Sequence, residues 1–307
     1  MMKNSTMTAY LLAAGLLFTA PSCGKQEPLE ETDATPIVFG AETPEILLDA
    51  ESKATSGATE VTSLSSFKVT CVTGAAGAES VRWENQSFSG SSSFTCSGRY
   101  WPHVQPTGND TFKFYATNAS ANLSFAAAGT SVNATNNQDV VCAYLSSSTW
   151  KGTAAQNKLT FGHIFGRLGS VKVIAASGYT LSNVSVAITP NTSGTYNLRT
   201  GTWSSMSNTS YTVASATSIA SGANATTDNN IYVIPGSYTI RATWTATMGD
   251  YTHTFSAVAS KAAIPFTAGK VTTLNMTLGG SATQIAFSYS ITAWDTSSAA
   301  TSVEFTY

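Results

Sequence analysis

The chain has 307 residues, 42% of them hydrophobic, and carries a formal net charge of −2. Only 10% of the residues are charged, so Ser, Thr and Asn must supply most of the polar surface. The lack of a basic field argues against nucleic acid and against electrostatic membrane binding as partners. The hydrophobic content is ample for a folded core.

The amino terminus has the pattern of a lipoprotein signal peptide. Lys3 precedes an apolar run over residues 10–20, and Pro21 and Ser22 stand before Cys23. The run is too short for a stable membrane anchor. A cysteine at the cut resembles a bacterial lipobox, in which the thiol receives a lipid such as palmitate. We therefore predict a signal peptide over residues 1–22 and lipidation of Cys23; an ordinary cleaved signal that ends near a cysteine is the alternative.

Residues 23–33 are acidic, nearly free of apolar side chains and without periodicity. This composition predicts a flexible tether between the lipid and the folded part. Acidic residues behind a lipidated cysteine also resemble surface-export signals of some outer-membrane lipoproteins, although an acidic linker that aids solubility explains them equally well. We expect a surface-exposed protein of the outer membrane, held by lipid through Cys23.

Beyond the tether, the pattern is that of β-strands, and helical spacing is almost absent. Alternation is clearest from Ile285 to Ala293, and Met248-Gly249-Asp250 predicts the turn of a long hairpin. So many short strands predict an all-β chain of two sandwiches, residues 34–169 and 170–307, with a boundary near Gly169. The predicted strands are 36–41, 66–73, 111–116, 139–145, 159–165, 170–175, 184–189, 194–198, 211–214, 231–234, 238–247, 251–258, 271–278 and 284–294.

Three cysteines follow the lipobox. Cys71 and Cys142 stand inside apolar strand-like runs, which predicts small buried thiols. A disulfide between two of Cys71, Cys96 and Cys142 remains an alternative in an oxidising compartment.

The run from Leu159 through Phe161 and His163, followed by alternating aliphatic residues, resembles the fimbrillin family, the subunits of type V bacterial pili. Trp101-Pro102 ahead of strand 111–116, and further short pieces, occur in the family's order over nearly the whole mature chain. The resemblance implies two tandem transthyretin-like β-sandwich domains, delivery as an outer-membrane lipoprotein, and a place in the fimbrium with other pilin subunits as partners. It implies a structural or tip subunit that serves cell adhesion, with ligands on host or bacterial surfaces.

Phe161, His163, Trp101 and Pro102 are interpreted as structural residues of the family motif. The other histidines stand at no spacing that would complete a metal set with His163, so we expect no metal there. Tryptophans beside Pro or Gly are expected to close the ends of the core, and a platform for sugar rings is the alternative. No nucleophile elbow, zinc helix or phosphate loop occurs, and single aspartates, Asp139 among them, stand where turns are expected. We predict a non-enzymatic protein without cofactors.

The resemblance also implies assembly by proteolysis-triggered donor-strand exchange, in which a cut behind the first strand opens a groove for a strand of another subunit. Lys53 is the sole basic residue between Lys25 and Lys68 and is the candidate cleavage site; an exposed loop lysine is the alternative. The candidate donor strand is the tail with Val303, Phe305 and Tyr307 at alternating positions, unless this tail completes the carboxy-terminal sheet. A surface lipoprotein that binds glycans or host proteins through its loops, without polymerising, is the rival function.

Overall fold

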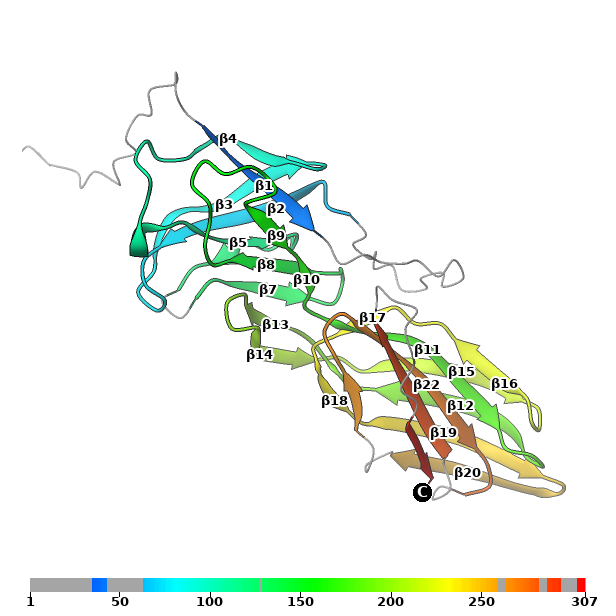
Figure 1. Ribbon diagram of the computed structural model, residues 1–307. Coiled ribbons are helices and arrows are strands. Elements are labelled where there is room, and N and C mark those ends of the chain that lie inside the picture. The colour runs from blue at the N-terminus through cyan, green and yellow to red at the C-terminus, as the bar shows by residue number, and fades with distance from the viewer. Residues whose placement is uncertain are drawn as a thin grey trace, which may run out of the picture. The chain divides into compact units, whose positions relative to one another are not determined.

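The computed structural model describes residues 35–42, 63–126, 129–258, 263–281, 286–293 and 303–306. Cys23, Lys53, Trp294 and Tyr307 lie outside these ranges. The described residues form an all-β structure, as predicted, in which the one helical element is a single 3-10 turn, Gly108–Asp110. Figure 1 shows the strands in chain order.

The largest sheet gathers strands from the first half of the chain. Its eight strands lie in the order β10-β8-β5-β2-β3-β4-β1-β9. The two strands at the ends of this path, β9 and β10, are consecutive in the chain and separated by Phe161 alone. The bounds are β1 Pro36–Glu42, β2 Ser66–Thr73, β3 Ser80–Gly90, β4 Phe94–Tyr100, β5 Lys113–Thr117, β8 Val141–Leu145, β9 Lys158–Thr160 and β10 Gly162–His163.

One core cluster gathers buried side chains from the strands of this sheet. Its buried side chains run from Ile37 to Phe161 in the sequence and are dominated by phenylalanine. Inward-facing aromatic residues alternate with outward polar residues along the strands, and the period of two puts all of them on one face. The Phe161 ring lies 5.0 Å from the Phe67 ring and closes the core between β9 and β10.

Two sheets from the second half enclose a second core cluster, which runs from Leu168 to Leu278. One has the order β16-β11-β22-β23-β24, with β17 also paired to β11, and β11 and β22 are parallel. The other has the order β15-β12-β19-β20. The bounds are β11 Gly166–Ala175, β12 Thr180–Ile188, β15 Tyr211–Ile219, β16 Asn224–Thr227, β17 Ile231–Val233, β19 Ile240–Met248, β20 Tyr251–Val258, β22 Lys270–Leu278, β23 Ala286–Ala293 and β24 Val303–Thr306.

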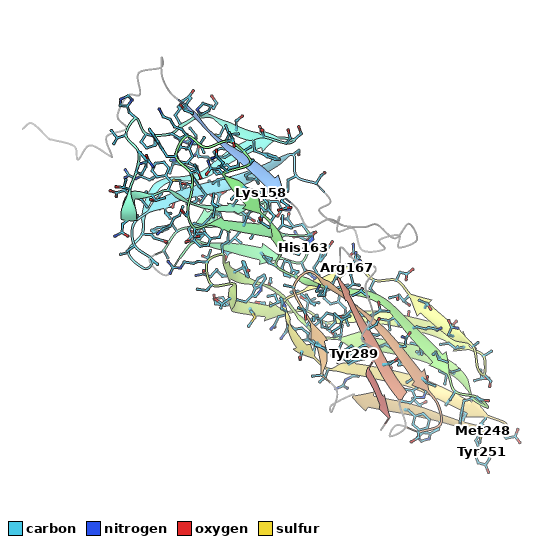
Figure 2. The ribbon with its side chains drawn as sticks, viewed as in Figure 1. Lys158, His163, Arg167, Met248, Tyr251 and Tyr289 are labelled. Carbon is cyan, nitrogen blue, oxygen red and sulfur yellow. The ribbon has the colours of Figure 1, made fainter. Side chains whose placement is uncertain are left out.

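The β19–β20 hairpin confirms the predicted turn. Met248 pairs with Tyr251, and Gly249 adopts φ of 58°, which glycine reaches without a steric penalty. Both pairing residues are exposed at the tip, where Figure 2 shows them projecting outward.

A four-stranded sheet joins segments from both halves of the sequence. Its order is β14-β13-β7-β6, so the hairpin of β13 and β14 pairs with β7 across residues Thr195 and Asn133. A third core cluster accordingly mixes side chains from Val72 to Ile234. The bounds are β6 Leu123–Ser124, β7 Ser131–Thr135, β13 Asn191–Asn197 and β14 Thr202–Asn208, and a separate pair consists of β18 Gly236–Tyr238 and β21 Ile264–Phe266.

The strand expected to begin at Ser170 begins four residues earlier, at Gly166. The reason is an irregularity in pairing with β22 between Leu168 and Val171, which interrupts the alternation within one strand. Gly169 therefore lies inside β11 and does not separate two strands. The assignment of residues 34–169 and 170–307 to two separate sandwiches stays a prediction.

Candidate functional site

The strand β1 occupies the position where the sequence places the exchangeable strand. It lies between β4, to which it is antiparallel, and β9, to which it is parallel (Figure 1). At its start the Trp101 backbone N–H donates to the Thr35 carbonyl at 2.9 Å. At its end the Phe161 N–H donates to the Glu42 carbonyl at 2.8 Å. Pairing with β4 thus holds residues Pro36 to Phe39, and pairing with β9 holds Gly40 to Glu42.

Two side chains of β1 fill the first core. Ile37 and Phe39 are completely buried. The Phe39 ring meets the Phe88 and Phe114 rings edge-on, with centroids 4.9 and 4.7 Å away. Burial of these two side chains stabilises the strand by about 1.5–3 kcal/mol each. Loss of β1 would leave an apolar groove between two unpaired strand edges.

The middle and end of β1 contact the segment that leads into β9. The Gly40 N–H donates to the carbonyls of Ala154, at 3.0 Å, and Asn157, at 3.2 Å. The Glu42 carboxylate lies 2.7 Å from the Lys158 ammonium, and Figure 2 labels this lysine. About half of each of these side chains is exposed, so the ion pair contributes little to stability.

The candidate cleavage residue Lys53 belongs to the connection from β1 to β2 and lies outside the described residues. Its role, like the lipidation of Cys23, stays a prediction. The described part of the connection resumes at Ser63.

The candidate donor strand is paired within its own chain. Val303–Thr306 forms β24 and runs antiparallel to β23, with Phe305 opposite Phe287 and Val303 opposite Tyr289. This is the arrangement of the alternative in which the tail extends the carboxy-terminal sheet. β24 is the last strand of its sheet, with one described neighbour. Donation of this strand to another subunit stays a prediction.

His163 and Asp139 form a buried pair that the sequence does not reveal. His163 Nδ1 lies 2.9 Å from Asp139 Oδ1, and both side chains are almost completely buried. Asp139, two residues before β8, was expected to be a turn residue, but it is only 1% exposed. Its buried carboxylate has the His163 imidazole as a hydrogen-bond partner. The pair fixes β10 to β8, and Figure 2 shows His163 near the start of β11.

A second polar cluster surrounds Glu79, which the sequence analysis missed. Its buried carboxylate lies 3.2 Å from Arg199 Nη1 and 3.5 Å from Lys113 Nζ, and it accepts a hydrogen bond from the Tyr115 hydroxyl at 3.3 Å. Burial, with the nearby carboxylate, raises the pKa of Tyr115 well above its usual range. No spacing rule signals such a cluster, because its members lie up to 120 residues apart.

The tryptophans of the described ranges pack against the cores. Trp101 is 2% exposed and stacks on Phe112, with centroids 5.7 Å apart. Pro102 contributes its carbonyl as acceptor for Trp150 Nε1 at 2.9 Å. Trp203 is half-buried against Phe165. Trp101 therefore offers no free face to a sugar ring.

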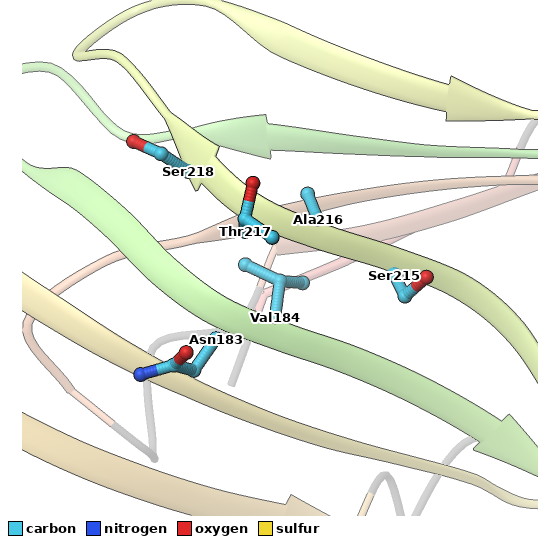
Figure 3. Close-up of a pocket in the computed structure, with 6 residues that line it drawn as sticks. All are labelled: Asn183, Val184, Ser215, Ala216, Thr217 and Ser218. Carbon is cyan, nitrogen blue, oxygen red and sulfur yellow. The ribbon is translucent and has the colours of Figure 1, made fainter.

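The hollow in Figure 3 lies over β12 and β15 and has a volume of about 580 Å³. Its lining consists of small neutral side chains, namely Asn183, Val184, Ser215, Ala216, Thr217 and Ser218. It lacks the aromatic and charged groups that orient a small ligand. Elsewhere in the described ranges, no group of three or more metal-binding side chains gathers. The same ranges contain no helix long and apolar enough to cross a membrane.

Comparison with known proteins decides the family. A fimbrillin-like family model matches residues 53–294, most of the chain. The chain belongs to the fimbrillin-like family. The matched region of this fimbrillin-like chain begins at Lys53, so β1 precedes it. The family is one of fimbrial structural and adhesion proteins and is not known for enzymes.

The chain is also similar to solved structures. A fimbrial protein from Bacteroides vulgatus is 13% identical to the fimbrillin-like chain, with a TM-score of 0.52 over 84% of this chain and 99% of that one. A candidate cell adhesion protein from Bacteroides ovatus is 18% identical, with a TM-score of 0.47 over 85% and 98%. The tip fimbrial protein Mfa3 from Porphyromonas gingivalis is 9% identical, with a TM-score of 0.37 over 84% and 100%. The first of these, with the highest TM-score of the three, supports a shared β-sandwich fold. No curated protein sequence matches the chain.

Proposed function

We propose that this chain is a structural or tip subunit of a type V fimbrium, delivered to the outer membrane as a lipoprotein through Cys23. Its partners are other pilin subunits, and its role is cell adhesion. Membership of the fimbrillin-like family supports the fimbrial part of this proposal. The lipobox pattern supports the route of delivery.

Assembly proceeds by exchange of β1. The observation that carries this step concerns β1, a short strand that precedes the region matched by the family model. Its Ile37 and Phe39 side chains are completely buried in the first core. A cut at Lys53 frees β1 from β2, and its departure exposes an apolar groove flanked by the edges of β4 and β9. Such an edge binds an extended strand through backbone hydrogen bonds, with pockets for alternate side chains. The tail with Val303 and Phe305 is the proposed donor.

Intact mass of material from the cell surface tests both processing steps. We expect a monomer that begins at acylated Cys23 and fimbrial subunits that begin directly after Lys53. Fimbriae whose subunits retain β1 would refute the exchange. Monomer without acyl mass would refute the lipid anchor and leave the exchange standing.

The rival function, capture of glycans or host proteins through loops without polymerisation, gains no support from the described residues. Trp101 is buried, and the hollow of Figure 3 carries neither aromatic nor charged side chains.

A further inference from the structure

The loop Thr149–Asn157, which leads into β9, is held in a fixed shape where it meets β1. Asn157 is completely buried, and its side chain bonds the Thr149 backbone twice, donating from Nδ2 to the carbonyl at 2.9 Å and accepting from the N–H at 2.7 Å. Trp150 Nε1 donates to the Pro102 carbonyl. These bonds anchor the loop at both of its ends and fix its shape while β1 is in place.

The loop approaches β1 too closely for any residue but glycine. A Cβ on residue 40 would lie 2.6 Å from the Ala154 carbonyl oxygen and 3.3 Å from its carbon. Real Cβ atoms essentially never come so near, and the obstacle is backbone, not the end of a flexible side chain. Gly40 does not have positive φ, so space and not backbone conformation demands glycine here.

We propose that the Thr149–Asn157 loop selects which strand can occupy the β1 groove: it admits a strand with glycine directly after the inward aromatic residue and rejects one with a side chain there. This proposal rests on the proposed strand exchange and adds to it a requirement on the sequence of the incoming strand. The pattern that fits is apolar-x-aromatic-Gly, as in Ile37 to Gly40. A β1 strand from a second copy of the chain fits the groove.

The tail of the chain does not follow this pattern. Placing Phe305 at the level of Phe39 puts Thr306 opposite Ala154 if the tail runs in the direction of β1, and Glu304 if it runs the other way. The tail can therefore enter only after β1 has left and the loop, which then loses both bonds from the Gly40 N–H, has shifted. The loop keeps a neighbouring tail from replacing β1 before the cut.

Peptide exchange on the mature chain tests the rule without changing the groove. A site-specific protease sequence is inserted in the 43–62 connection, the chain is cut, and fluorescence anisotropy reports the binding of labelled peptides. The probes are peptide 35–42, its Gly40→Ala form, peptide 301–307, and a Glu42→Gln form as control at an exposed position.

We expect the native and Glu42→Gln peptides to bind alike. The Gly40→Ala peptide should bind roughly 5- to 150-fold more weakly, the range that overpacking of a fixed site produces. Peptide 301–307 should also bind more weakly than the native peptide. Equal affinity of the Gly40→Ala or the 301–307 peptide with the native peptide would overturn the selection rule and leave strand exchange intact. Binding of no peptide at all would overturn both.

A second measurement uses the uncut chain. Gly40→Ala should lower the Tm, whereas Gly162→Ala should not, because nothing lies within 4 Å of a Cβ at residue 162 and its φ is not positive. Equal Tm values for the two variants would contradict a fixed loop.

Discussion

Phe39→Ala should weaken the hold of β1 on the first core. The ring is completely buried and lies against Phe88 and Phe114. Truncation of a buried phenylalanine costs about 3–5 kcal/mol, of which each aromatic pair accounts for about 0.5–1.5 kcal/mol. In a chain of this size 1 kcal/mol lowers Tm by roughly 2–4 °C. We therefore predict a fall of roughly 6–20 °C.

Thermal unfolding followed by circular dichroism measures this effect, with Val38→Ala as the matched control. Val38 is the neighbouring residue of β1, only partly buried and on the opposite side of the strand, so its truncation should cost less than half as much. After a cut in the 43–62 connection, the Phe39→Ala chain should also lose β1 faster on gel filtration. Equal Tm shifts for the two variants would show that the Phe39 side chain does not hold β1 in the first core.

Further predictions concern processing, the tail and the thiols. Lys53→Gln should leave β1 attached in surface material and reduce fimbriae, as read by amino-terminal sequencing; unchanged cleavage would remove Lys53 from the scheme. Deletion of residues 299–307 should abolish polymer ladders on gels, and an undiminished yield would disprove the donor role of the tail. Burial raises the pKa of the Cys71 thiol well above its usual range, so a maleimide at neutral pH should label the half-buried Cys96 and spare Cys71 in the native protein. Faster labelling at Cys71 would contradict the packing of β2.

Strands that face a core were predictable from the sequence. Ser66–Thr73 and Tyr251–Val258 have the predicted bounds, because their apolar residues recur at a period of two or run continuously. The strands that were missed include β3, β4, β7 and β14. The segment Thr202–Asn208 explains why, since most of its side chains are exposed and serine-rich and only the ladder to β13 makes it a strand.

The candidate site was predictable in part. Residues 36–41 were predicted as a strand, and the position of Cys71 and Cys142 in apolar runs predicted buried thiols, which the structure shows as free. The Asp139–His163 pair was out of reach, because a carboxylate beside turn residues is more often exposed. The requirement for Gly40 depends on a loop more than 100 residues later, and nothing local distinguishes that glycine from others.

The ladder between β7 and the β13–β14 hairpin bears on how a fibre built from this protein would carry load. Strands before residue 164 and strands after it are joined by the peptide chain and, in parallel with it, by the backbone bonds from Ser193 to Asn197. Separating these two groups of strands would require the ladder bonds to break before the chain could extend. A protein fragment ending at residue 169 would lack β13, and the edge of β7 that pairs with β13 would be exposed.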